Sequence, residues 1–191
     1  MMSGTLTRTL AIVRLADRLL REAGVDAAPV STGLVQTLHP EIEILPAPLG
    51  PVASSLVIPG PASSIGKVRL FFHERQSIPR QRFSIAHEYG HYLLHHLKLL
   101  DSEAPTDPAL REAEADRFAS WLLVPLWLLD QAAENISYNA EDKTALERMS
   151  YRLASRFNVS RSCMNRALFE LFHLRKAFEG SAAAKHRQAK R

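Results

Sequence analysis

A short stretch of the sequence, RFSIAHEYGHYLLHH at residues 82–96, holds four of the chain's eight histidines. Within it His87 and His91 are four residues apart, so on a helix their imidazoles leave the same face about one turn apart. That spacing lets one nitrogen of each ring reach a single Zn²⁺ at about 2.0–2.1 Å. Glu88 follows the first histidine and is placed to act as general base on a water that the metal activates. The His-Glu-x-x-His pattern therefore predicts the zinc site of a metallopeptidase.

A catalytic zinc site needs a third protein ligand and one open position. His95 lies eight residues after His87, roughly 12 Å further along a helix axis, which is too far for both rings to bind one ion. We therefore expect His95 and the neighbouring His96 to face the surface or a partner.

The stretch REAEADRFASWLLVP at residues 111–125 offers carboxylates on the next predicted helix. Glu112 and Asp116 are four residues apart and share a face, whereas Glu114 points about 160° away from Glu112. We therefore predict Glu112 as the third zinc ligand. Asp116 is then expected to accept a hydrogen bond from the second ring nitrogen of a ligand histidine.

The alternative interpretation is a core-facing helix whose histidines are only packed and hydrogen-bonded. Alone, the acidic stretch would be read as a solvated charged face of a helix. Two features favour the metal site: one loop separates the two motifs, and Gly90 precedes His91. Glycine is unfavourable inside a helix and usually marks a close approach of another backbone.

The elements that would position these residues suggest an α+β fold. Apolar residues repeat with a helical period over residues 6–23, and KVRLFF alternates in the manner of a strand. A short antiparallel or mixed sheet is expected, followed by the histidine helix and a helical C-terminal half. Its strands are predicted at EIEILP, SSLVIPG and residues 67–72, and the helices at 109–124, before Pro125, and at 142–178, with a turn at 158–160.

The distribution of charge along the chain separates a near-neutral domain from a basic C-terminal segment. The formal net charge of the 191 residues is +4, and residues 180–191 alone carry four basic and no acidic side chains. We therefore expect a single domain over residues 1–178, with the helical segment 142–178 included, and a disordered basic tail over 179–191.

The only cysteine, Cys163, excludes an intramolecular disulfide and a cysteine-based zinc cluster. The apolar run at 121–129 is too short to span a membrane, so we predict a cytoplasmic protein without a membrane partner.

The paired motifs resemble those of the ImmA/IrrE-type zinc metallopeptidases. These read roughly R-F-[ST]-[LI]-A-H-E-L-G-H and E-x-E-A-[ND]-x-F-A-x-x-L-L-M-P, and the similarity is strong over residues 80–125. It is moderate over 153–168 and loose over the first 75 residues. The sequence departs from the pattern at Tyr89, where leucine is usual, and at Val124, where methionine is usual. Neither departure falls on an expected ligand.

The resemblance implies a small gluzincin-like fold with zinc held by His87, His91 and Glu112 and with Glu88 as general base. The members of the family that have been studied cleave helix-turn-helix repressors of mobile elements or stress responses, which relieves repression, and other members have unknown substrates. The resemblance thus implies a cytoplasmic zinc endopeptidase whose partner is such a repressor.

A competing interpretation rests on residues 145–172, which read as a helix-turn-helix. Arg161 and Arg166 could face phosphates or bases, so the chain could be a DNA-binding regulator or an inactive peptidase-like binding module. Direct nucleic-acid binding is the weaker alternative, because the charge of this segment is not strongly of one sign. For the peptidase, we expect an extended substrate to pair with a sheet edge near residues 67–72. Tyr92, His73 and Tyr138 are unranked candidates for stabilising the oxyanion.

Overall fold

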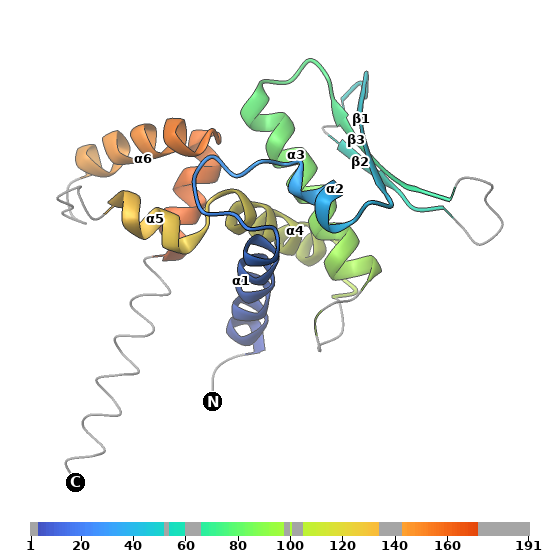
Figure 1. Cartoon of the computed structure of the whole chain (residues 1–191). Coiled ribbons are helices and arrows are strands. Elements are labelled where there is room, and N and C mark those ends of the chain that lie inside the picture. The colour runs from blue at the N-terminus through green and yellow to red at the C-terminus, as the bar shows by residue number, and fades with distance from the viewer. Residues whose placement is uncertain are drawn as a thin grey trace, which may run out of the picture.

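The structure of the protein, a computed structural model, describes residues 4–51, 54–59, 66–97, 100, 105–133 and 143–171. It is an α+β domain of the predicted class, with a small sheet on one side of a group of helices (Figure 1). In chain order the elements are α1 (Gly4–Glu22), α2 (Leu34–Leu38), β1 (Ile42–Ala47), β2 (Ser54–Val57), β3 (Val68–His73), α3 (Ile78–His91), the π-helical turn η1 (Tyr92–His96), α4 (Pro108–Leu123), α5 (Leu126–Ala133) and α6 (Lys143–Phe157). Residues 161–171 form a further helix. The predicted boundary at residue 178 and the predicted tail lie outside the described residues.

The sheet is mixed, with strand order β1-β3-β2. The strand β3 runs parallel to β1, where Ile42 pairs with Val68, and antiparallel to β2, where Ser54 pairs with Phe72. All three strands were predicted, but the expectation that residues 67–72 offer a free edge is wrong. This segment is the central strand, and its backbone groups are taken by both neighbours. Within the described residues, β2 is the edge strand on that side.

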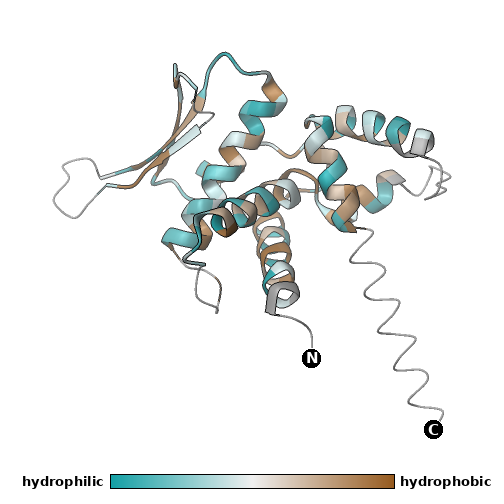
Figure 2. Cartoon of the chain, turned by 180° about the vertical axis from the view of Figure 1, so that it is seen from behind, coloured by the Kyte–Doolittle hydropathy of each residue, from teal (hydrophilic) through white to brown (hydrophobic). Residues whose placement is uncertain are grey.

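The helices pack through one apolar face each. The histidine helix α3 contacts β3 and β2 on one side and α4 on the other, and α4 also packs against α1. Figure 2 shows hydrophobic and hydrophilic residues alternating along the same helices, as expected where one face is buried. The largest fully buried side chains include Trp121, Tyr89, Phe118, Phe157 and Ile12. Side chains from α1, α3, α4 and α6 therefore contribute to one hydrophobic core.

The close contact between α3 and α4 depends on Gly90. A Cβ atom at this position would lie 3.0 Å from Cδ1 of Phe118 and 3.3 Å from Cα of Ala115. The sequence-based expectation that this glycine marks a close backbone approach is confirmed. As a consequence, the helix that carries the histidines and the helix that carries the carboxylates lie nearly backbone to backbone.

The C-terminal helices are tied to the histidine helix by Arg82. Its guanidinium donates hydrogen bonds of 3.0 Å to the carbonyl of Asn158 and 2.8 Å to the carbonyl of Val30. Asn158 adopts a positive φ of 51° in the turn between α6 and the helix at 161–171. The predicted turn at 158–160 is thus held against α3. No helix within the described residues is long and apolar enough to cross a bilayer.

Candidate metal centre

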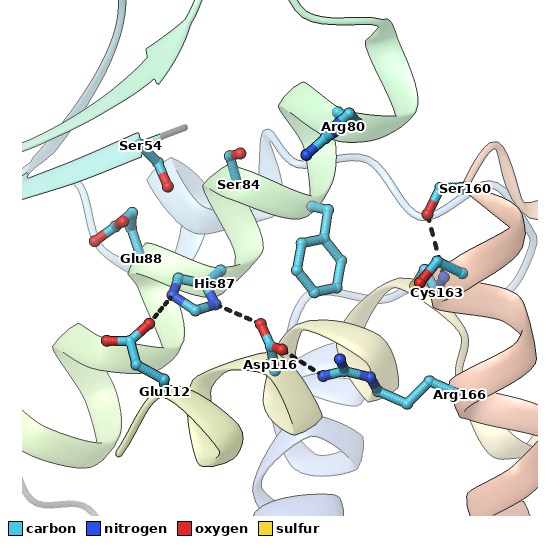
Figure 3. A pocket seen from close by; sticks show the side chains of 12 residues that line it. Ser54, Arg80, Ser84, His87, Glu88, Glu112, Asp116, Ser160, Cys163 and Arg166 are labelled. Atoms are coloured by element: carbon cyan, nitrogen blue, oxygen red, sulfur yellow. Dashed lines mark hydrogen bonds and ion pairs between the residues drawn. The ribbon is translucent and has the colours of Figure 1, made fainter. Parts of the chain in front are cut away.

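The two histidines of the motif and the first glutamate of α4 face one another. The Nε2 atoms of His87 and His91 are 3.0 Å apart, and each lies 3.2 Å from one oxygen of Glu112 (Figure 3 shows the contact to His87). His87, His91 and Glu112 are also the group of side chains in the described part of the chain that could hold a metal ion. The three predicted ligands are therefore brought together, from α3 and α4.

The donor set fits zinc. Four ligands at about 2.0–2.1 Å in tetrahedral arrangement lie about 3.3 Å from one another, close to the 3.0–3.2 Å separations here. Two imidazole nitrogens and a carboxylate are also the ligand types that catalytic zinc sites use. Glu112 is largely exposed, with 63% of its side chain accessible, so the centre is open on that side. An open side leaves room for a water or a substrate oxygen.

The second nitrogen of His87 is held by a carboxylate. Its Nδ1 lies 2.9 Å from Oδ1 of Asp116, and the other oxygen of Asp116 lies 2.6 Å from Nη1 of Arg166 (Figure 3). Burial alone would raise the pKa of Asp116, but the hydrogen bonds from His87 and Arg166 outweigh it and lower this pKa. Burial would likewise lower the pKa of His87, whereas Asp116 and the nearby glutamates raise it. Asp116 thus lies where the sequence analysis predicted, with an arginine that it did not anticipate.

The second nitrogen of His91 faces another histidine. Its Nδ1 lies 3.0 Å from Nδ1 of His95, and Nε2 of His95 lies 3.2 Å from Oε2 of Glu114. The expectation that His95 faces the surface is wrong, because its side chain is only 2% accessible. His96 is exposed, as expected. Burial, followed by the neighbouring His87, lowers the pKa of His91.

Glu88 lies beside these ligands in an open cavity of about 590 Å³. The residue is 8% exposed and lines the cavity together with Ser54 of the edge strand β2 (Figure 3). The cavity wall is completed by Arg80, Phe83, Ser84, Ser160, Cys163 and Arg166, among others. It therefore extends from the metal centre towards the start of the helix at 161–171. A carboxylate, a metal centre and an edge strand share one cavity.

The two described candidates for stabilising the oxyanion, Tyr92 and His73, have other hydrogen-bond partners. The hydroxyl of Tyr92 donates to Glu41 at 3.0 Å, and Nδ1 of His73 accepts from the backbone N–H of Arg75. Tyr138 lies outside the described residues. Neither described candidate thus gains support as an oxyanion donor.

The fold and the centre define a small α+β zincin-like domain with two helices that converge on one candidate metal site. The family model of the IrrE N-terminal-like domain, a peptidase family, matches residues 40–169. The chain therefore belongs to this family of zinc-dependent peptidases, as the motif resemblance implied.

A solved structure supports the fold. The chain is similar to a Mycobacterium tuberculosis transcriptional regulator, with a TM-score of 0.56 and 18% sequence identity. The match covers 80% of this chain but only 45% of that protein, so the chain spans less than half of its length. No curated protein matches the sequence at a significant level.

Proposed function

We propose that the chain is a zinc-dependent, site-specific endopeptidase that cuts a protein substrate in the cytoplasm. One observation carries the proposal: the nitrogens of His87 and His91 and the carboxylate of Glu112 form a set of donors 3.0–3.2 Å apart. Two members of this set, His87 and Glu112, line the same cavity as Glu88. Within the family, the arrangement favours hydrolysis of a peptide bond.

Each residue of the centre would have a separate role in the reaction. His87, His91 and Glu112 would hold a zinc ion, which would supply a Lewis acid for the scissile carbonyl and lower the pKa of water. The carboxylate of Glu88 accepts a proton from the attacking water and later donates it to the nitrogen of the leaving amine. Asp116 keeps the ring of His87 oriented through Nδ1.

The substrate is proposed to bind as an extended segment along β2. Ser54, the first residue of β2, lines the cavity, and β2 is an edge strand within the described residues. An extended peptide can add to such an edge through main-chain hydrogen bonds. This replaces the earlier expectation of pairing at β3.

The substrate class we propose is a helix-turn-helix repressor of a mobile element or a stress response, whose cleavage relieves repression. The paired sequence motifs support this class, because repressors are the substrates that the resemblance implies. A direct role of the chain in DNA binding is less favoured. Of the two arginines considered for it, Arg166 is engaged with Asp116 in the cavity.

The test compares new protein N-termini, by mass spectrometry, in cells that express the wild-type chain or Glu88→Gln. The substitution keeps the size of the side chain and leaves the three zinc ligands in place. We expect one or a few cuts only with the wild type, and we expect them in a DNA-binding repressor. Cuts of equal extent with both proteins would contradict the role of Glu88. An absence of wild-type cuts under all stresses tested would contradict the endopeptidase.

A further inference from the structure

A row of buried side chains runs from the metal centre to the N-terminal helix. It begins at Nδ1 of His91, 3.0 Å from Nδ1 of His95, and continues from Nε2 of His95 to Oε2 of Glu114 at 3.2 Å. The carboxylate of Glu114 in turn meets the guanidinium of Arg8 through two contacts, one of them 2.8 Å from Nη2. The side chains of His95, Glu114 and Arg8 are 2%, 8% and 15% accessible. Solvent therefore does not compete strongly for these hydrogen bonds.

His95 lies four residues after His91, within the π-helical turn η1 (Tyr92–His96). Single π turns within α-helices occur frequently at functional sites. Here the ring centroids of His91 and His95 lie 5.1 Å apart, which keeps the two rings in contact.

The chemistry of these side chains determines which atom donates and which accepts in each hydrogen bond of the row. A guanidinium only donates, so both oxygens of Glu114 accept, and Nε2 of His95 must carry the proton that it shares with Glu114. In the neutral ring, Nδ1 of His95 is then an acceptor. Nδ1 of His91 therefore donates, and the lone pair of its Nε2 is left for the metal.

His87 is oriented by a shorter row of the same design. Its Nδ1 faces Asp116, which is paired with Arg166 from the helix at 161–171. Each ligand histidine is thus connected through a carboxylate to an arginine. The two arginines come from opposite ends of the described chain.

We propose that His95, Glu114 and Arg8 are positioning residues that fix the tautomer and the ring orientation of His91, and that α1 thereby belongs to the metal centre. This inference rests on the proposed zinc site. It extends the centre beyond the family match, which begins at residue 40, since Arg8 lies on α1. A mere packing role for the row would predict an effect on folding but none on zinc affinity in a folded variant.

The first test replaces His95 in the zinc-loaded protein. His95→Leu fills the space but cannot accept a hydrogen bond, whereas His95→Gln offers an amide oxygen in its place. Loss of such an outer hydrogen bond typically weakens metal binding by about 10- to 100-fold. We expect a rise of this size in the zinc dissociation constant of His95→Leu, measured by competition with a chelator, and a partial recovery in His95→Gln.

A spectroscopic readout accompanies the affinity. In the zinc-loaded wild type, ¹⁵N NMR of the histidine rings should show a protonated Nδ1 of His91 in slow exchange with water. In His95→Leu this proton should exchange faster. Wild-type affinity and a protected Nδ1 proton in folded His95→Leu would overturn the proposal.

The second test addresses the far end of the row, where a matched control is available. Arg8→Gln removes the guanidinium that pairs with Glu114, and Arg18→Gln makes the same change at an exposed position of the same helix. We expect Arg8→Gln to weaken zinc binding at least tenfold more than Arg18→Gln. Equal effects of both variants would overturn the proposal. If His95→Leu does not fold, this pair of variants decides alone.

The outcomes separate this inference from the proposed function. If the wild type binds no stoichiometric zinc, the proposed zinc peptidase is contradicted, and the inference falls with it. If the wild type binds zinc tightly and the folded variants bind it equally well, only the positioning role is contradicted.

Discussion

Replacing Gly90 with alanine tests whether the spacing of α3 and α4 controls the metal centre. The new Cβ would lie 3.0 Å from Cδ1 of Phe118, 3.3 Å from Cα of Ala115 and 3.4 Å from its carbonyl oxygen. The phenyl ring can yield by a small rotation, but the backbone of Ala115 yields only if α4 moves. A shift of a few tenths of an ångström is therefore expected between the helices that carry His91 and Glu112.

Two opposing contributions set the expected stability change. Alanine is favoured over glycine inside a helix by about 1 kcal/mol. Overpacking a tight interface typically costs about 1–3 kcal/mol. The metal-free variant should therefore be less stable than the wild type by about 0–2 kcal/mol. Urea unfolding of chelator-treated protein measures this difference.

The effect on zinc should exceed the effect on folding. Binding constellations need their side chains held within about 0.5 Å, so a wider gap between His91 and Glu112 should raise the zinc dissociation constant by roughly tenfold or more. In Gly90→Ala/Phe118→Leu the phenyl contact is relieved while the contact with the Ala115 backbone remains, so zinc binding should stay weak. A Gly90→Ala protein that is about 1 kcal/mol more stable than the wild type and binds zinc equally well would refute this reasoning.

Three further predictions concern single side chains. Tyr89 is fully buried and its hydroxyl has no hydrogen-bond partner among the described residues, so Tyr89→Phe should stabilise the protein by about 1 kcal/mol and raise Tm by about 2–4 °C. A lower Tm would indicate a hidden partner. Burial raises the pKa of Cys163 to about 11, so at pH 8 about one thiol in a thousand is a thiolate, and the folded protein should react with a disulfide reagent far more slowly than the urea-unfolded protein. Because the thiolate is the reactive form and the raised pKa delays its formation, this rate should keep increasing as the pH rises towards 11. Equal rates in folded and unfolded protein would contradict the burial of Cys163. Removing zinc that is present at 1,000 times its dissociation constant should cost about 4 kcal/mol of stability, and Glu112→Ala should abolish most of that chelator-dependent fall in Tm. A full chelator effect in Glu112→Ala would contradict its role as a ligand.

The sequence predicted those parts of the site that depend on local spacing. His87 and His91 share a helix face because they are four residues apart, and Glu112 and Asp116 share one for the same reason. Gly90 predicted the close contact between the two helices, because glycine is unfavourable inside a helix and usually marks a close approach of another backbone. The α+β class followed from a strand period before residue 73 and a helical period after it.

The parts that were missed depend on contacts between distant segments. Arg8 and Glu114 are 106 residues apart, and no local pattern connects them. His95 was expected at the surface because it lies too far along the helix to share a metal ion with His87, and its buried partner Glu114 lies on another helix. The order of the sheet was missed because alternation identifies a strand without showing which strands flank it. The sequence shows an acidic residue, Glu114, among the apolar residues of α4 and a basic residue, Arg8, on α1. Nothing in the sequence indicates that these two residues form a pair.

The proposed zinc centre can be tested directly by a crystal structure of the zinc-loaded protein with diffraction data collected on both sides of the zinc absorption edge. We predict one anomalous peak per chain, within about 2.0–2.2 Å of Nε2 of His87, Nε2 of His91 and a carboxylate oxygen of Glu112. A peak bound by His95 in place of Glu112, or no peak at these residues in protein that carries one zinc per chain, would contradict the proposed centre.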